Sequence, residues 1–265
     1  MSVRVRFLRA PQEFRMVQDV AQRAWSFSDR EIPTTADLCA IAHVGGVVAG
    51  AFEGREMLGF VTGLPRLGLG EPCLHSHMLA VVPEAQGRGL SVRLKLFQRR
   101  FCLGHGIRLV TWTYDPLLVK NAALNLNRLR ARATRYVRDC YGPMGGIYHG
   151  LPTDRFEVRW RLDAPAVVRA ARGHAPLPAD VAQLPRARPG HIPRARRLAL
   201  EIPAGAPGFY ASAPRRALRA RLDLRLLAES LLARGYEATG LVPGPRTALY
   251  VFERRRVRSG TRGDH

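Results

Sequence analysis

Two short stretches of the sequence carry residue types that could do chemistry, and the first is a pair of histidines. His75 and His77 lie in the segment His75-Ser76-His77-Met78-Leu79-Ala80-Val81, whose β-branched and apolar content is typical of a strand. Residues two apart on a strand face the same side. A neutral imidazole can take a proton from an amine near neutral pH. The pair therefore predicts a general base, although a structural, hydrogen-bonding role for either histidine stays open. No third ligand is nearby in the sequence, so no metal site is expected.

The second stretch is the turn Gln86-Gly87-Arg88-Gly89-Leu90-Ser91, which joins that strand to an amphipathic helix. Glycine allows a steep turn and lets an anion approach the backbone closely. The first amides of a helix have no intrahelical partners, and the helix dipole adds partial positive charge. The turn therefore predicts a phosphate-binding site. Its spacing is neither GxGxxG nor GxxxxGK[ST], which argues against a dinucleotide fold and against a P-loop ATPase.

These residues resemble the GNAT superfamily of N-acetyltransferases, which carries [QR]-x-x-G-x-[GA] at this point. Gln86 and Gly89 match the pattern, whereas Ser91 departs from its last position but is small. The similarity extends from His77 to Lys95, and the order of expected elements fits the family over residues 3–162. The stretch from Thr111 to Pro116, with Asn121 and Asn125-Leu126-Asn127, further resembles a bacterial subgroup of poorly defined substrate.

The resemblance implies acetyl-CoA or another acyl-CoA as the donor substrate, bound mainly by main-chain groups. Pyrophosphate would contact the motif that starts at Gln86, through the amides of Gly87, Arg88, Gly89, Ser91 and Val92. The strand amides near Leu79 and Val81 would pair with the pantetheine arm, and Asn121 would hydrogen-bond the cofactor. An amine would then attack the acyl carbonyl directly, without a covalent enzyme intermediate.

The general acid is less well defined by the resemblance. Many family members use a tyrosine in the helix after the splayed strand, where this chain has Leu126 and Arg128. Tyr141 is the substitute we name, with Tyr114 and Tyr136 as alternatives. A CoA thiolate can also leave unaided, since the pKa of a thiol is not far above neutral.

The elements that must position these residues follow from hydrophobic periodicity, and they indicate an α/β (mixed α+β) fold. We expect a GNAT-like central mixed, splayed sheet flanked by helices, plus a C-terminal β-α-β-β extension. On the helix after the glycine turn, Arg93, Lys95, Arg99 and Arg100 are expected to face solvent. A further helix is expected over residues 118–129, and Asp115 before it is expected to be a turn residue or N-cap.

Composition divides the chain into four parts. Residues 1–163 would form the acyltransferase domain, 164–195 a Pro/Ala/Arg-rich linker without periodicity, 196–256 an accessory β-α-β-β subdomain, and 257–265 a frayed tail. The accessory part would extend the sheet, cover the acceptor side or build a homodimer.

The formal net charge is +21, and nearly all the positive charge is arginine. An arginine surface could bind nucleic acid, but the arginines are spread along the chain without interleaved aromatic residues, so nucleic acid is not the expected partner. Five of them, on the long helix near residues 216–234, are interpreted as a solvated face: Arg215, Arg216, Arg219, Arg221 and Arg225.

Features that the sequence lacks indicate where in the cell the protein acts and narrow its candidate functions. The four cysteines form no CxxC pair, no run of about 18 apolar residues suggests a membrane partner, and the N-terminus shows no apolar signal region. A cytoplasmic protein is expected. The leading hypothesis is an acyl-CoA-dependent N-acyltransferase acting on a small-molecule amine. The alternatives are a CoA-binding sensor or scaffold with weak or no catalysis, and an arginine-rich nucleic-acid binder.

Overall fold

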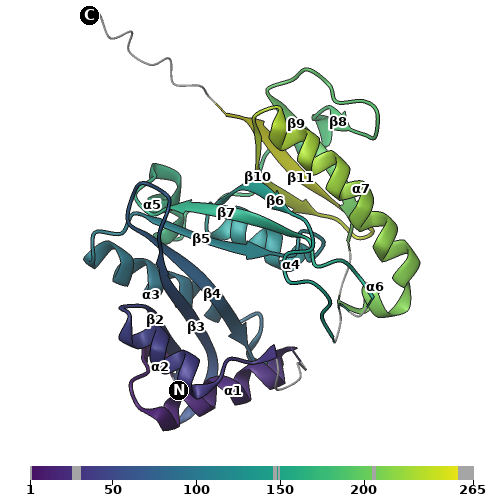
Figure 1. Cartoon of the computed structure of the whole chain (residues 1–265). Helices are drawn as coiled ribbons and strands as arrows, with labels where there is room; N and C mark the ends of the chain where they lie inside the picture. Colours follow the sequence, from purple (N-terminus) through teal and green to yellow (C-terminus); the bar gives the residue numbers. More distant parts are fainter. Residues whose placement is uncertain (1, 26–30, 146–147, 149, 205–206, 256–265) are drawn as a thin grey trace, which may run out of the picture.

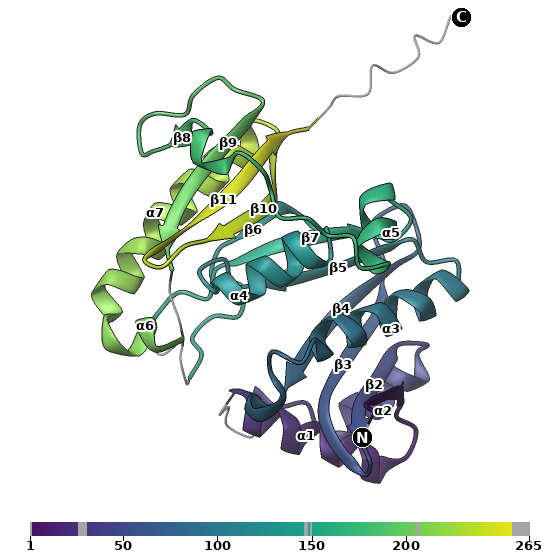
Figure 2. The same ribbon diagram turned by 180° about the vertical axis from the view of Figure 1, so that it is seen from behind.

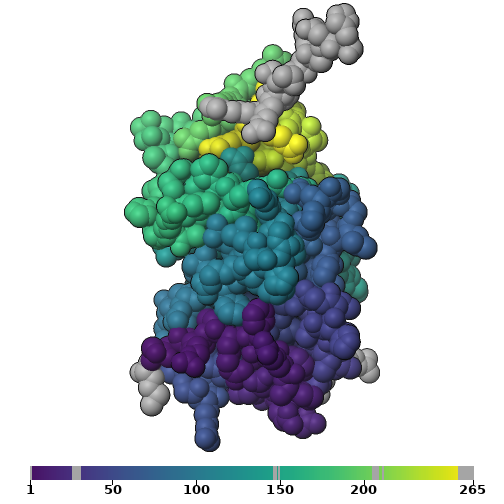
Figure 3. All heavy atoms as spheres, turned by 90° about the vertical axis from the view of Figure 1, so that its left-hand side faces the viewer, coloured from purple at the N-terminus to yellow at the C-terminus, as the bar shows by residue number. Residues whose placement is uncertain are grey.

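A computed structural model describes residues 2–25, 31–145, 148, 150–204 and 207–255. Its strands form one mixed sheet in the order β1-β2-β3-β4-β5-β7-β6-β10-β11-β9-β8. The strands are β1 (Arg4–Phe7), β2 (Val47–Glu53), β3 (Glu56–Arg66), β4 (Cys73–Val81), β5 (Leu109–Tyr114), β6 (Arg132–Val137), β7 (Arg155–Arg161), β8 (Arg186–Ala187), β9 (Arg197–Pro203), β10 (Tyr236–Pro243) and β11 (Thr247–Arg254). The first and last strands therefore lie at opposite ends of an elongated molecule (Figures 1 and 3).

The helices flank this sheet (Figures 1 and 2). They are α1 (Pro11–Trp25), α2 (Thr35–His43), α3 (Leu90–Gly104), α4 (Val119–Ala122), α5 (Pro165–Ala171), α6 (Pro207–Ser212) and α7 (Pro214–Ala233). Local sequence explains the first two. Phe14, Val17 and Val20 recur at helical spacing on α1 and are buried. Thr34 and Asp37 form a reciprocal capping box that starts α2.

The centre of the sheet splits between β4 and β5, as the fold prediction requires. These strands run parallel and pair only at Cys73 with Leu109, Leu74 with Val110, and His75 with Thr111. Beyond His75, β4 keeps β3 as a neighbour on its other side, and β5 keeps β7. The expected splayed sheet is therefore confirmed, and the histidine pair begins at the point where the two strands separate.

Local structure departs from the expectations, or adds to them, in three places. The helix expected over 118–129 is α4 followed by a π-helix, Ala123–Arg128. In this π-helix the Asn125 side chain accepts a hydrogen bond from the Trp112 indole (3.2 Å). The segment 164–195 is not irregular throughout, because it contains α5 and β8. The short helix α6 was missed, since Pro207-Gly208 at its start is typical of a turn.

The C-terminal segment joins the sheet through β10, which pairs with β6. Asn127 in the π-helix strengthens the junction: its side chain donates to the Leu241 carbonyl (2.6 Å) and accepts from the Leu241 N–H (3.0 Å). Three roles were considered for this segment, and in the structure it extends the sheet.

A buried ion pair also ties α7 to the end of β5, which corrects the solvated-face interpretation of that helix. Arg221 is fully buried and lies 2.9 Å from Asp115. Arg225 binds both carboxylate oxygens of Asp154, each at 2.8 Å. Asp115 is also the expected turn residue, because its other oxygen accepts the Leu117 N–H (2.9 Å). Two of the five helix arginines therefore belong to the interior.

Candidate functional site

The glycine turn after β4 has the open geometry that anion binding needs. A short 3₁₀ turn, Pro83–Ala85, leads into Gly87 (φ +81°) and Gly89 (φ +75°), and Gly89 is the N-cap of α3. Both φ values lie in the left-handed region, which glycine adopts without strain. A Cβ added at either position would meet no heavy atom within 4 Å. The turn is therefore not filled by protein atoms.

Among the described residues, the main-chain donors at this turn have no hydrogen-bond acceptor. The first bond of α3 runs from the Arg93 N–H to the Gly89 carbonyl (3.1 Å), so the amides of Leu90, Ser91 and Val92 precede the helical ladder. Within the described ranges, no hydrogen bond is donated by the main-chain N–H of residues 87 to 89. A run of adjacent free amides at a helix N-terminus suits a phosphate group.

The nearby arginine side chains are already engaged. Arg88 pairs with Glu53 at the end of β2, and its hydrogen bond and charge lower the pKa of that carboxyl. Arg93 donates to the Val3 carbonyl. Main-chain groups, not side-chain charge, are therefore the available donors at the turn.

Within the described residues, the edge of β4 that faces the split has no strand partner beyond His75. The Val82 N–H bonds to the Leu58 carbonyl of β3 (3.0 Å). Because successive residues of a strand point their N–H and C=O groups to opposite sides, Leu79 and Val81 direct theirs away from β3. The Gln86 side chain confirms this direction by donating to the Val81 carbonyl (3.3 Å). An extended molecule could add to this edge like a further strand.

The two histidines share one face of β4 at the start of the split, with ring centroids 6.4 Å apart. His75 Nδ1 lies 3.4 Å from the Thr111 hydroxyl of β5. Burial, the neighbouring His77 and Arg66 together lower the pKa of His75 to about 4. Desolvation by neighbouring protein atoms also lowers the pKa of His77, although the residue as a whole is exposed. Both imidazoles are therefore neutral at pH 7, and His77 is the more accessible.

Of the three candidate tyrosines, the structure brings Tyr141 to the split. It is exposed, and its hydroxyl lies 2.9 Å from that of Thr113. Thr113 follows Thr111 by two residues on β5, so it shares the face on which His75 meets Thr111. The alternatives Tyr114 and Tyr136 are buried, which raises the pKa of both hydroxyls well above its ordinary value. Tyr141 is thus the accessible hydroxyl of the three.

Lys95 is the important residue that sequence reasoning misplaced. It was expected to face solvent but is only 2% exposed. Its Nζ donates to the Ser76 hydroxyl (2.7 Å) and lies 3.6 Å from the centroid of the Trp112 ring. Ser76 and Trp112 directly follow the last paired residues of β4 and β5. Lys95 therefore occupies the fork where the strands part, and burial lowers its pKa to about 7.

A signal for this burial was present in the sequence. Lys95 is three residues before Gln98 and seven before Cys102, and both of these side chains are buried. That spacing places all three on one stripe of the helix. The interpretation failed because a lysine was assigned to solvent by its type instead of by its position.

Two further expectations concern the cofactor and metals. Asn121 is exposed on α4, after β5, and its predicted hydrogen bond to a cofactor remains a prediction. Within the described part of the chain, no group of three or more His, Cys, Asp or Glu side chains could hold a metal ion. Across the same residues, no helix combines the length and apolar character needed to cross a membrane.

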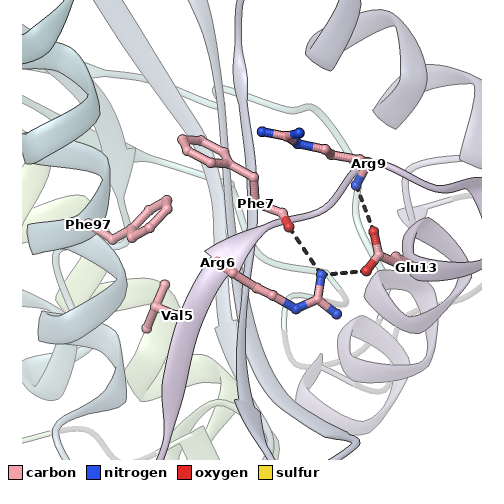
Figure 4. Close-up of a pocket in the computed structure, with 6 residues that line it drawn as sticks. All are labelled: Val5, Arg6, Phe7, Arg9, Glu13 and Phe97. Carbon is pink, nitrogen blue, oxygen red and sulfur yellow. Dashed lines mark hydrogen bonds and ion pairs between the residues drawn. The ribbon is translucent and has the colours of Figure 1, made fainter.

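A separate hollow of about 560 Å³ lies at the β1 edge of the sheet (Figure 4). It is lined by Val5, Arg6, Phe7, Arg9, Glu13 and Phe97, and contains none of the predicted site residues. Burial alone would raise the pKa of Glu13, but hydrogen bonds from the Arg9 and Ala10 N–H groups and from Arg6 lower it to about 2. This carboxylate is committed to holding β1 against the start of α1.

Part of the chain is similar in sequence to a known protein family, and its fold is similar to solved structures. Residues 14–123 match the family model described as the acetyltransferase (GNAT) family. No curated protein matches the chain. Among solved structures, a proposed acetyltransferase of Salmonella typhimurium, determined with its cofactor acetyl-CoA, is 16% identical (TM-score 0.50, 62% of this chain and 96% of that one). At this identity the likeness concerns the fold alone.

Two other solved structures are similar over the same share of the chain. A proposed GNAT acetyltransferase of Desulfovibrio desulfuricans is 20% identical, with a TM-score of 0.48, and covers 61% of this chain and 99% of that one. The ribosomal-protein-S18-alanine N-acetyltransferase of Escherichia coli is 15% identical, with a TM-score of 0.48, and covers 60% and 92%.

Proposed function

We propose that this chain, whose residues 14–123 match the acetyltransferase (GNAT) family model, transfers an acetyl group from acetyl-CoA directly to a primary amine of a small molecule. One observation carries the proposal: in the described part of the chain, main-chain donors without partners at an open glycine turn lie next to a split in the sheet whose edge has no strand partner. A diphosphate fits the first feature and an extended pantetheine arm fits the second.

In this proposal, the amides from Gly87 to Val92 hold the pyrophosphate, and Leu79 and Val81 pair with the pantetheine arm. The thioester then lies near the fork, beside the face that carries His75 and His77. The amine nitrogen forms a bond to the acyl carbon as the carbon–sulfur bond breaks, and the electron pair leaves with the CoA sulfur.

Proton transfer needs a base and an acid. His77 is the better placed base, because it is accessible and neutral, and it takes the proton lost by the attacking amine, directly or through a water. The pKa of His75, at about 4, makes that imidazole a weak base, so its role is to hold Thr111 and the fork. Tyr141 donates a proton to the departing thiolate.

A second candidate is a CoA-binding protein with little catalysis, used for sensing or as a scaffold. One observation favours it: the helix turn where many family members place the acid tyrosine holds Leu126, which is fully buried. Under either candidate the four cysteines, none of which forms a disulfide, suit a cytoplasmic location.

Two measurements separate these candidates. Thermal shift with acetyl-CoA and with succinyl-CoA tests for acyl-CoA binding, and stabilisation is expected under both candidates. Thiol release with a panel of primary amines then tests for transfer. Stabilisation without any thiol release would support the sensor. Absence of stabilisation by either acyl-CoA, together with salt-resistant stabilisation by DNA, would overturn both in favour of a nucleic-acid binder.

A further inference from the structure

The sheet face that carries the histidines continues into a charged hollow of about 630 Å³. We call it the arginine groove. The charged residues that line it are Arg66, Arg135, Glu157, Arg159, Glu237 and Arg255. It begins beside His75, because Arg66 donates to the Thr111 hydroxyl (2.9 Å), the same hydroxyl that lies 3.4 Å from His75 Nδ1.

Strand register shows how far the groove extends from the split. On β7, Arg159 lies opposite Thr111 of β5, and Glu157 lies opposite Thr113. On β6, Arg135 lies opposite Glu157, and β10 with Glu237 is the next strand. Neighbouring strands are about 4.8 Å apart, so the groove spans about 14 Å from β5 to β10. A molecule with its amine at the fork could lay its remaining atoms along this groove.

The charges in and around the groove do not balance. Glu157 lies 2.6 Å from Arg66 and 3.6 Å from Arg135. The other two carboxylates are shared in the same way: Glu71 lies 3.5 Å from Arg159 and 2.5 Å from Arg161, and Glu237 lies 2.8 Å from Arg132 and 3.1 Å from Arg255. Beyond these three, Glu253 lies 3.5 Å from Arg132 and 3.4 Å from Arg197. Among the described residues, these seven arginines therefore share four carboxylates.

The excess of positive charge in the arginine groove differs in its arrangement from the positive charge spread over the rest of the chain. The carboxylates Glu157 and Glu237 have side chains only 14% and 9% exposed, whereas the arginines around them reach solvent. Each of these two carboxylates thus lies within ion-pair distance of two guanidinium groups. A concave surface with an excess of one sign of charge focuses the field on a bound molecule. Guanidinium groups suit carboxylate and phosphate oxygens especially well.

We propose that the arginine groove selects an acceptor amine that also carries a carboxylate or a phosphate. This inference rests on the proposed function, since it names the acceptor class for the same site. Arg66 and Arg159 lie nearest the fork, across from Thr111, so the anionic group and the amine are separated by a short chain of atoms. Amines of equal length that carry no carboxylate or phosphate lack the group that the groove binds.

The test compares 4-aminobutanoate with butylamine, which have the amine on the same three-carbon chain and differ in the terminal carboxylate. Thiol release from acetyl-CoA should give kcat/KM about tenfold higher for 4-aminobutanoate, the effect of one charge-assisted contact. A parallel assay with 3-aminopropyl phosphate identifies the preferred anion. Equal kcat/KM for butylamine and both anionic amines would overturn the inference.

Matched variants locate the effect. Arg159→Gln and Arg135→Gln should each raise KM for 4-aminobutanoate and reduce its advantage over butylamine. Arg108→Gln is the control, because Arg108 is an exposed arginine outside the groove, paired at 3.4 Å with Asp163. An equal loss of preference in all three variants would show that general positive charge, and not the groove, attracts the acceptor.

Binding measurements keep this inference separate from the proposed function. The CoA-loaded protein is titrated calorimetrically with 4-aminobutanoate and with butylamine. Selective binding of 4-aminobutanoate that Arg159→Gln weakens, in a protein that never releases thiol, would support the groove and refute the transferase. Equal acetylation of both amines would support the transferase and refute the groove.

Discussion

Replacement of Gly89 by aspartate tests the cradle on which the proposed function depends. Gly89 has φ +75°, and an added Cβ would meet no heavy atom within 4 Å. The new side chain would therefore not collide with the protein, and it would project from the turn where the diphosphate is expected. Two effects follow, backbone strain and charge repulsion, and they can be separated.

The strain is modest and is shared by any non-glycine residue. A residue with a Cβ in the left-handed region costs about 1–2 kcal/mol of stability. The charge effect belongs to aspartate alone. A carboxylate about 5 Å from a diphosphate of about two negative charges is repelled by about 1.7 kcal/mol even at the dielectric constant of water. That corresponds to about 15-fold weaker CoA binding, and a less polar environment would increase it.

Calorimetric titration with CoA at low salt measures this difference in four proteins. Gly89→Asp should bind CoA at least about 15-fold more weakly than Gly89→Ala, which carries the strain without the charge. Gly106→Asp is the matched control, because Gly106 (φ +72°) lies just beyond the other end of α3 and also has open space at its Cβ. It should bind CoA like the unaltered chain. Unchanged affinity in Gly89→Asp would refute the assignment of the diphosphate to this turn.

Three further predictions concern the histidines, the buried ion pair and the buried lysine. His77→Ala should lower kcat at pH 7 more than at pH 9, because more of the acceptor amine is already neutral at pH 9; His75→Ala should have the smaller effect, since the pKa of His75 is about 4. Thiol release from pH 6 to 9 measures both, and rates that fall equally at every pH would remove imidazole from the proton transfer. Asp115→Asn leaves Arg221 buried without its counter-charge and should lower the free energy of unfolding by about 3–5 kcal/mol in urea titrations; a loss under about 1 kcal/mol would contradict a buried pair. Burial lowers the pKa of Lys95 from 10.5 to about 7, so between these pH values the unfolded chain holds a proton that the folded chain has lost. Stability from this residue is therefore lowest below pH 7 and rises toward pH 10.5, by up to about 5 kcal/mol, and Lys95→Met should flatten that rise in urea unfolding at pH 7 and pH 9.5. An identical rise in the variant would show that Lys95 keeps its proton when folded.

The features that could be predicted from sequence are those fixed by short-range physics. The sequence defines the strand β5, Leu109–Tyr114, and the helix α1, Pro11–Trp25, locally, through β-branched residues before Asp115-Pro116 and through helical spacing after Pro11. The open turn at Gly87 and Gly89 was predictable for the same reason. Only glycine takes φ values near +80° without strain, and two of them before an amphipathic helix leave few other conformations.

The features that could not be predicted depend on partners far away in the sequence. Arg221 looks like a solvated helix residue until Asp115, 106 residues earlier, is brought against it. The π-helix over 123–128 depends in the same way on β10, whose Leu241 main chain is bound by Asn127 from 114 residues away. No local pattern signals these contacts, because the side chain types involved are also common on surfaces.

The composition of the chain likewise does not predict which of its groups would bind CoA. A net charge of +21 suggests that arginine side chains would bind the phosphates of CoA. At the turn itself, however, Arg88 is held by Glu53 and Arg93 by the Val3 carbonyl, whereas the main-chain amides have no partner among the described residues. A guanidinium would have to leave its partner before it could bind phosphate, but a free amide at a fixed turn is already in place. In the proposed function, recognition of the diphosphate would therefore depend on a backbone shape set by two glycines, and the arginine-rich composition would contribute mainly to attraction at longer range.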